Sequence, residues 1–123
     1  MPPATHCRQL VCPAAEDTSL PAVLAALSDP TRLALVMVLA EHGEQPWGDF
    51  DLRIGKSTFS HHVKVLREAG LLHHRREGTR CWISLRRDLK SGYGEVLAML
   101  LKLAADDPLV AELAATARLP LPA

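Results

Sequence analysis

Apolar residues recur at helical spacing in several stretches of this 123-residue chain. In LPAVLAAL, residues 20–27, the leucines and the valine fall on one stripe of a predicted helix. A second helix is predicted over residues 31–42, because Asp29 can cap it and Pro30 can take its first position. Apolar residues cover most sides of this second helix, which indicates deep burial, and Gly43 ends it.

A third helix is predicted in KSTFSHHVKVLREAG, residues 56–70, with Ser57 as its cap. Phe59, Val63 and Leu66 form its apolar stripe. At about 100° per residue, the opposite side of this helix is polar. That side holds Ser57, His61, Lys64 and Glu68, with Ser60 and Val65 flanking it.

A β-hairpin is predicted next, in LLHHRREGTRCWISL, with its turn at Glu77-Gly78. Its second strand alternates, so that one face is apolar and holds Cys81, Ile83 and Leu85. Residues 44–55 contain Pro46 and Gly48 and allow at most a short helix. Residues 94–117 predict one apolar helix, or a helix broken at Pro108.

The predicted order is first helix, second helix, short helix within residues 44–55, third helix over residues 56–70, hairpin and last helix. This is the order of a winged helix-turn-helix, a mainly α fold with a small β-hairpin as its wing. The length suits one domain. We expect a flexible N-terminal arm over residues 1–18, the winged-helix domain over 19–118 and a short tail over 119–123.

Composition agrees with packed helices, since hydrophobic residues make up 48% of the chain and aromatic residues only 4%. The formal net charge is zero, yet residues 53–90 hold ten of the fourteen Lys and Arg residues and three of the fourteen acids. Such a basic block attracts polyanions, although a solvated face is the plainer interpretation of charge alone.

The sequence also bounds the compartment. No run of about 18 apolar residues is present, so we expect no membrane span and no membrane partner. The N-terminus lacks the apolar core of a secretory signal. Three cysteines, an odd number, argue against a secreted disulfide scaffold, so we expect a cytoplasmic protein.

The third helix carries small hydroxyl and imidazole side chains in its first two turns, which suits a recognition helix that enters the major groove of DNA by its N-terminal end. These groups can hydrogen-bond to base edges, while cations neutralise phosphates without reading sequence. We expect base contacts from Ser57, Thr58, Ser60, His61 and His62, although His62 also lies beside the apolar stripe. We expect phosphate contacts from Lys56, Lys64, Arg67, Arg75, Arg76 and Arg80.

The motifs themselves resemble those of the arsenic-repressor (ArsR/SmtB-type) family of bacterial transcriptional regulators. The resemblance covers about half of the chain and rests on SDPTR in the second helix, on STFSHH and LREAGL in the third, and on REG in the wing. It implies a homodimer, built on the terminal helices, that binds a palindromic operator in double-stranded DNA and represses transcription. The large apolar surface of the first and last helices independently favours a partner.

The familiar sensor sites of this family are missing. Many relatives carry a Cys-x-Cys pair before the recognition helix, where this chain has PWGDF, and others bind zinc through a last helix that here contains no His. Cys7 and Cys12 in the arm are left as candidates for a thiophilic metal, for a redox disulfide, or for neither. Cys81 is expected to be buried and inert.

Other functions are weaker. His61 and His62 are adjacent and diverge by about 100° on a helix, so they do not chelate one metal ion as an i, i+4 pair does. The glycine-rich phosphate loop, the His-Glu metal motif and the Gly-x-Ser-x-Gly elbow are absent, so we expect no enzyme. Trp47 and Trp82 are interpreted as packing residues. The main alternative is a winged-helix module that binds an acidic protein.

Overall fold

The computed structural model describes residues 13–50 and 54–117. Within them the elements are η1 (Ala15–Asp17), α2 (Leu20–Ala26), α3 (Pro30–His42), β1 (Gln45–Pro46), η2 (Trp47–Asp49), α4 (Lys56–Glu68), β2 (Leu72–Glu77), β3 (Arg80–Leu85), α5 (Tyr93–Ala104) and α6 (Pro108–Ala117), where η marks a 3-10 helix. The predicted winged helix-turn-helix order is confirmed.

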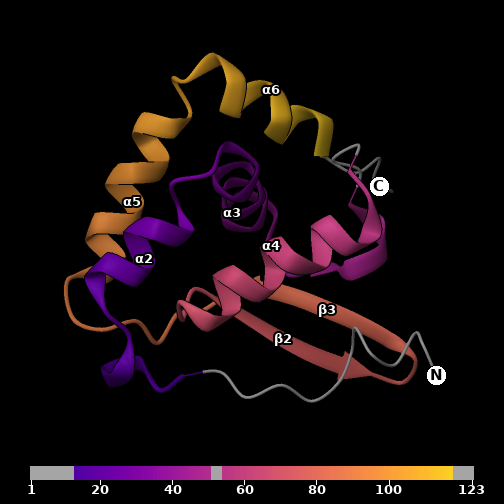
Figure 1. Ribbon diagram of the computed structural model, residues 1–123, viewed down its shortest axis with the longest axis horizontal. Coiled ribbons are helices and arrows are strands. Elements are labelled where there is room, and N and C mark those ends of the chain that lie inside the picture. Colours follow the sequence, from indigo (N-terminus) through magenta and orange to yellow (C-terminus); the bar gives the residue numbers. More distant parts are fainter. Residues whose placement is uncertain (1–12, 51–53, 118–123) are drawn as a thin grey trace.

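Helix α3 is the centre of the fold. It is seen nearly end-on in Figure 1, with the other helices around it, and α6 packs along it. Its start follows the prediction, since the Asp29 carboxylate accepts hydrogen bonds from the backbone N–H groups of Thr31 and Arg32 at 2.8 and 3.1 Å. Leu35 and Val36 are fully buried. They lie on different sides of the helix, which agrees with the apolar residues on most of its sides.

The β-structure is larger than a hairpin. Strands β2 and β3 form the predicted wing, with Gly78 at φ +63° in its turn, and β1 pairs with β3 on the other side. The sheet order is therefore β1-β3-β2, all antiparallel. Two residues of β1 were not predicted as a strand, because Gln45-Pro46 is too short to show any alternation.

The C-terminal end of α4 is closed by a Schellman motif. The Gly70 N–H donates to the Arg67 carbonyl at 2.9 Å and the Leu71 N–H to the Leu66 carbonyl at 3.0 Å. Gly70 has φ +87°, and a Cβ built on it would collide with the Thr18 side chain. This position therefore needs glycine for both its backbone conformation and its close neighbour.

Residues 13–18, expected as part of a flexible arm, pack against this corner instead. The Arg86 guanidinium donates to the Pro13 carbonyl at 2.6 Å and the Lys90 ammonium to the Thr18 carbonyl at 3.1 Å. Thr18 is buried. The order of this segment thus comes from long-range contacts that its local sequence does not reveal.

The C-terminal helical region takes the second of the two predicted forms. It breaks between α5 and α6, where the Asp107 carboxylate accepts from the N–H groups of Leu109 and Val110 and so caps α6. No single helix in the described part of the chain is both long and apolar enough to cross a membrane; α2 and α3 pass that test only as a pair and are bent by 99° at their junction.

Candidate nucleic-acid interface

Helix α4 has one buried and one solvent-facing side, as predicted. Phe59, Val63 and Leu66 are buried in the core. The polar side is exposed along its length, with Ser60 half-buried beside it. The exposed residues on this side are Lys56, Ser57, Thr58, His61, Lys64 and Glu68.

The start of α4 differs in one respect from the prediction. Gly55, not Ser57, is the N-cap residue, and no side chain caps the helix. Ser57 therefore lies inside the first turn, and its hydroxyl is not used as the cap. The Thr58 hydroxyl is exposed one position further on. Both hydroxyls thus face solvent at the N-terminal end of α4, which is the end by which a recognition helix contacts base edges.

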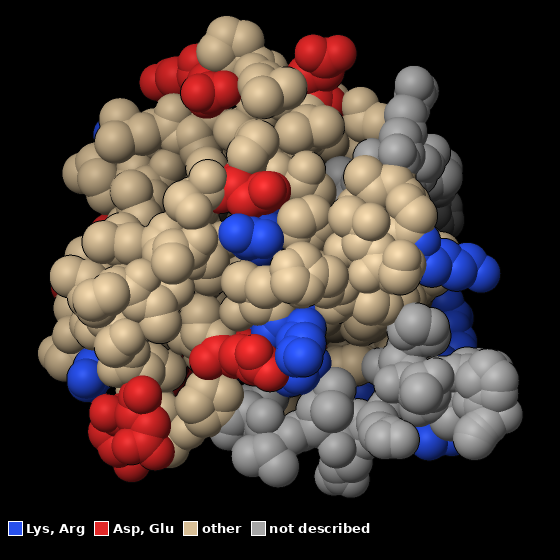
Figure 2. Space-filling view, viewed as in Figure 1, with Lys and Arg blue, Asp and Glu red and all other residues tan. Residues whose placement is uncertain are grey.

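The wing tip is cationic. Arg76 and Arg80 are exposed on either side of the turn, and the Arg76 Nε donates to the Gly78 carbonyl at 3.0 Å. The Arg80 guanidinium lies 5.0 Å from the centre of the Trp82 ring, a cation–π distance. Several Lys and Arg side chains lie along the edge of the molecule where one end of α4 and the wing are found, whereas acidic side chains gather near the α5–α6 turn (Figure 2).

Two side chains expected to contact DNA lie inside the protein. His62 is 9% exposed and Arg67 is 7% exposed. His62 faces α3, where its Nδ1 lies 3.1 Å from Arg32 Nη1, and burial is the main reason why its pKa is lowered from the ordinary value of 6.5. His62 lies beside the apolar stripe, as expected, whereas the burial of Arg67 was not predicted; the expected DNA contacts of both residues do not fit this placement, since a buried group cannot reach a groove or a phosphate. In Figure 1, α4 lies between α3 and the strands of the wing.

Arg75, also expected to contact phosphate, is already paired. Its Nε and Nη2 lie 2.8 and 2.9 Å from the two Glu44 carboxylate oxygens, and its Nη1 lies 3.4 Å from Glu77. Its hydrogen bonds to Glu44 are the main reason why the pKa of that carboxyl is below its ordinary value of 4.5. Glu44 was missed by the sequence analysis, because it is separated from Arg75 by 31 positions and no spacing rule connects them.

Between α3 and α4, aromatic packing takes the place of a full helix. Trp47 of η2 meets the Phe59 ring edge-on at 5.2 Å and stacks on His74 of β2 at 5.1 Å. Trp47 is therefore a packing residue, as predicted, and it connects the first part of the helix-turn-helix to α4 and the sheet. The abbreviated helix expected here is the 3-10 helix η2.

One of the three cysteines, Cys81, lies within the described residues. Within residues 13–50 and 54–117, no group of three or more His, Cys, Asp or Glu residues could hold a metal ion. Cys81 is 6% exposed on the inner face of β3, as predicted, but it is disulfide-bonded, so the expectation that it is inert was wrong. Cys7 and Cys12, the other cysteines of the chain, lie outside the described residues.

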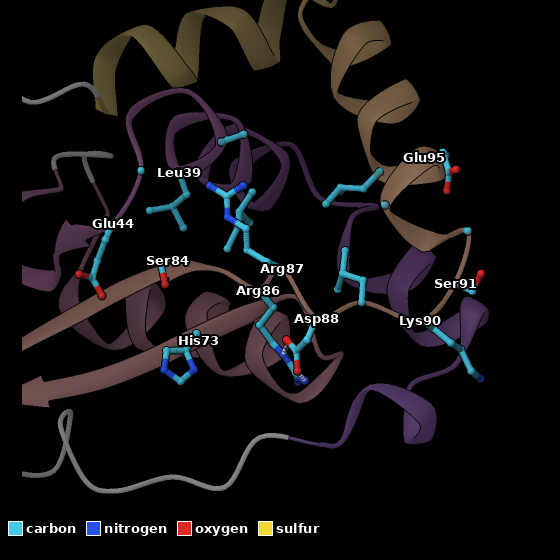
Figure 3. A pocket seen from close by; sticks show the side chains of 17 residues that line it. Leu39, Glu44, His73, Ser84, Arg86, Arg87, Asp88, Lys90, Ser91 and Glu95 are labelled. Carbon is cyan, nitrogen blue, oxygen red and sulfur yellow. Dashed lines mark hydrogen bonds and ion pairs between the residues drawn. The ribbon is translucent and has the colours of Figure 1, made fainter.

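A cavity of about 830 Å³ lies on another part of the molecule, between the end of α3, the base of the wing and the start of α5 (Figure 3). Its charges are largely paired within the protein. Arg86 forms a two-pronged ion pair with Asp88 at 2.8 and 3.0 Å, and Glu44 is held by Arg75. The lining thus contains acids and bases in similar number and selects no particular ligand charge.

Comparison with known proteins agrees with this geometry. Residues 27–75 match the family model of a helix-turn-helix domain. An uncharacterized HTH-type transcriptional regulator of Methanocaldococcus jannaschii is 37% identical over 59 residues, which cover 46% of this chain and 66% of that protein. The uncharacterized HTH-type transcriptional regulator YceK of Bacillus subtilis is 38% identical over 74 residues, which cover 58% of this chain and 74% of that protein.

Proposed function

Since this chain belongs to the helix-turn-helix family of transcriptional regulators, we propose that it is a repressor of the arsenic-repressor type, which binds a palindromic operator as a homodimer in the cytoplasm. One observation carries this proposal. The side of α4 that bears hydroxyl and imidazole groups faces solvent, and the wing next to it ends in two exposed arginines.

Base and phosphate contacts divide along this surface. Short hydroxyls and an imidazole can form hydrogen bonds with base edges, so base reading falls to Ser57, Thr58, Ser60 and His61. Cations on a flexible stem or a wing suit phosphates. Lys56, Lys64, Arg76 and Arg80 take this role, whereas Arg67 and Arg75 are left out because one is buried and the other is paired.

Dimerisation is supported by apolar side chains that the single chain leaves uncovered. Val96, Met99 and Leu103 are 40, 56 and 61% exposed and recur on one side of α5 at i, i+3 and i+7. Leu20 and Leu24 of α2 are 42 and 45% exposed. Such a set is costly in water, and a second copy with the same apolar face is a self-complementary cover for it. Two recognition helices would then lie about 34 Å apart.

An effector route through thiols has one specific support. Disulfides are rare in cytoplasmic proteins, where they are mostly transient, and Cys81 is disulfide-bonded in the wing. We infer that a cellular dithiol reduces this bond: two electrons and two protons pass to the two sulfurs, and the dithiol becomes a disulfide. A thiophilic metal held by Cys7 and Cys12 is the competing effector, because both are thiolate donors.

The test of the proposed function is a mobility-shift titration on DNA from upstream of the protein's own coding sequence, with unrelated DNA as competitor. A repressor of this type shifts its own upstream DNA at protein concentrations that leave unrelated DNA free. Arg76→Ala is compared with Arg87→Ala, because Arg87 is an exposed arginine beyond the far end of β3 from the wing tip.

The Arg76 variant should lose affinity and the Arg87 variant should not. Equal binding to all DNA, with no effect of Arg76→Ala, would instead favour a winged helix that binds an acidic protein.

A further inference from the structure

One arginine connects the first helix of the domain to the candidate recognition helix. Arg32 Nε donates to the carbonyl of Ala26, the last residue of α2, at 2.7 Å. Nη1 of the same guanidinium lies 3.1 Å from Nδ1 of His62 in α4. Arg32 is itself fixed at the first turn of α3, where the Asp29 carboxylate caps its N–H. A single side chain therefore spans three helices.

This geometry defines the state of the His62 ring. A guanidinium has five donors and no acceptor, so His62 Nδ1 must accept the hydrogen bond. The imidazole is then neutral, with its proton on Nε2. A protonated ring is a donor at both nitrogens and cannot accept from Arg32.

The surroundings of His62 also disfavour the charged ring. Burial is the largest effect and lowers its pKa below 6.5, and the positive charge of Arg32 lowers it further, as does His61 on the same helix. Asp29, at the start of α3, acts in the opposite direction and raises the pKa. Helix α2, which also packs on α4, has no ionisable side chain in LPAVLAA.

We propose that Arg32 is a positioning residue that sets the orientation of α4 relative to α2, and that protonation of His62 releases this connection and weakens operator binding at acid pH. The proposal rests on the proposed function, because α2 is a dimerisation helix and α4 the reading helix. Loss of the acceptor leaves two cations side by side, and α4 can then leave the orientation that two-fold DNA sites require.

The variant at position 62 separates this effect from the other histidines. Protonation of His62 weakens binding, so a loss of affinity on acidification that disappears in His62→Asn reports His62.

The experiment measures operator affinity by fluorescence anisotropy at pH 7.5 and pH 5.5 for the wild type and three variants. His62→Asn places an amide oxygen close to the position of Nδ1 and does not titrate. Arg32→Lys keeps the charge but replaces the planar guanidinium, whose Nε and Nη1 serve the two acceptors separately, by a single ammonium nitrogen on a flexible stem. His42→Asn, at the end of α3 and half exposed, is the matched control.

The wild type and His42→Asn should lose up to about tenfold in affinity per His62 ring at pH 5.5, the limit for a ring whose pKa returns to its ordinary value of 6.5 when the connection is released. His62→Asn should bind as the wild type does at pH 7.5 and should not weaken at pH 5.5. Arg32→Lys should be weak at both. A His62→Asn variant that weakens as much as the wild type would overturn the proposal.

A second measurement needs no DNA. Nitrogen-15 shifts of the His62 ring should show Nδ1 unprotonated and Nε2 protonated at pH 7.5, with a titration midpoint below 6.5 that rises in Arg32→Ala. If no operator is bound while the ring behaves in this way, the proposed function fails and the Arg32–His62 connection stands. A ring with Nδ1 protonated, or a midpoint unchanged in Arg32→Ala, would sink the connection itself.

Discussion

The Arg75 guanidinium and the Glu44 carboxylate meet in a two-pronged ion pair, with N–O distances of 2.8 and 2.9 Å, that holds the second strand of the sheet to the chain just before β1. Strand β3 lies between β1 and β2 in the sheet. The Arg75 guanidinium, which comes from β2, lies 5.5 Å from the centre of the Trp82 ring of β3. An arginine with these contacts stabilises the middle of the wing, where Arg75 pairs with Trp82, while Arg76, its neighbour in sequence, is exposed one position nearer the tip.

This pairing predicts that adjacent arginines behave differently on DNA. Arg76→Ala should lower the slope of log affinity against log salt by about 0.9, the value for one lost phosphate contact, whereas Arg75→Ala should leave the slope nearly unchanged. The measurement is anisotropy on one operator at four salt concentrations. Equal slopes for the two variants would contradict the assignment of Arg75 to the ion pair with Glu44 in place of a phosphate.

The same pair predicts a pH dependence of stability. Because the pKa of Glu44 is lowered in the folded state, the pair's contribution is fully present above the ordinary value of 4.5 and is lost as pH falls through the folded value. Thermal unfolding of the wild type and of Glu44→Gln should therefore differ at pH 7, and the difference should shrink as pH falls below 4.5. A difference of the same size at pH 7 and at pH 3 would show that the carboxylate charge is not the cause.

Base reading predicts a loss of discrimination. Ser57→Ala and His61→Ala should each reduce the preference for the operator over single-base variants at particular positions by about 1–3 kcal/mol. Ser91→Ala removes an exposed hydroxyl in the loop before α5 and should change nothing. Binding to a set of operator variants measures the effect. Uniform weakening on all sequences would assign Ser57 and His61 to phosphates instead.

The corner at Gly70 predicts a large effect of one methyl group. Gly70→Ala forces φ +87° on a residue with a Cβ and drives that atom into Thr18, so the free energy of unfolding should fall by at least roughly 1–3 kcal/mol. Gly94→Ala, in the first turn of α5 with open space around it, should be stabilising by up to about 1 kcal/mol. Urea unfolding of both variants provides the comparison.

Uncovered apolar residues on α5 predict the assembly state. Met99→Glu and Leu103→Glu should each convert the proposed dimer to a monomer in sedimentation velocity and abolish binding to the proposed operator, because a buried charge without a partner is strongly unfavourable. Lys102→Glu changes charge by more on the same helix, outside the Val96–Met99–Leu103 stripe, and should stay dimeric. A wild-type protein that sediments as a monomer at all concentrations would remove this part of the proposal.

The disulfide at Cys81 predicts a thiol count. Alkylation of the denatured, unreduced chain should modify one of its three cysteines, and all three after treatment with dithiothreitol. In Cys81→Ser the unreduced chain should show two free thiols. Three free thiols without a reductant would exclude redox control through this bond.

Sequence patterns were sufficient for the parts of this fold that depend on local periodicity. The polar side of α4, the Asp29 cap and the apolar face of β3 were all predicted, because each depends on residues within a few positions of one another. What failed depends on distant partners. Arg75 was predicted to contact phosphate, because local sequence does not indicate its ion pair with Glu44. Strand β1 likewise depends on a distant partner, since it forms by pairing with β3.

His62 and Arg67 show the same limit on a smaller scale. Both lie on the flank of α4, about 100° from an adjacent residue whose placement was predicted correctly. Helical periodicity predicts which residues lie at the centre of a helix face. Whether a residue at the border of that face is buried depends on which other element packs there. For His62 the neighbour is Arg32, whose presence in SDPTR marks a helix start but does not indicate the contact that its side chain makes.

The packing of residues 13–18 has a consequence for N-terminal truncation of this protein. A version that began at Ser19 would leave the surface of Gly70 bare, take one carbonyl away from Arg86 and another from Lys90, and loosen the end of the reading helix. Shortened forms should therefore keep Pro13. A loss of function in a form cut back to residue 19 would reflect this damaged corner, and would be no proof that the removed segment touches DNA.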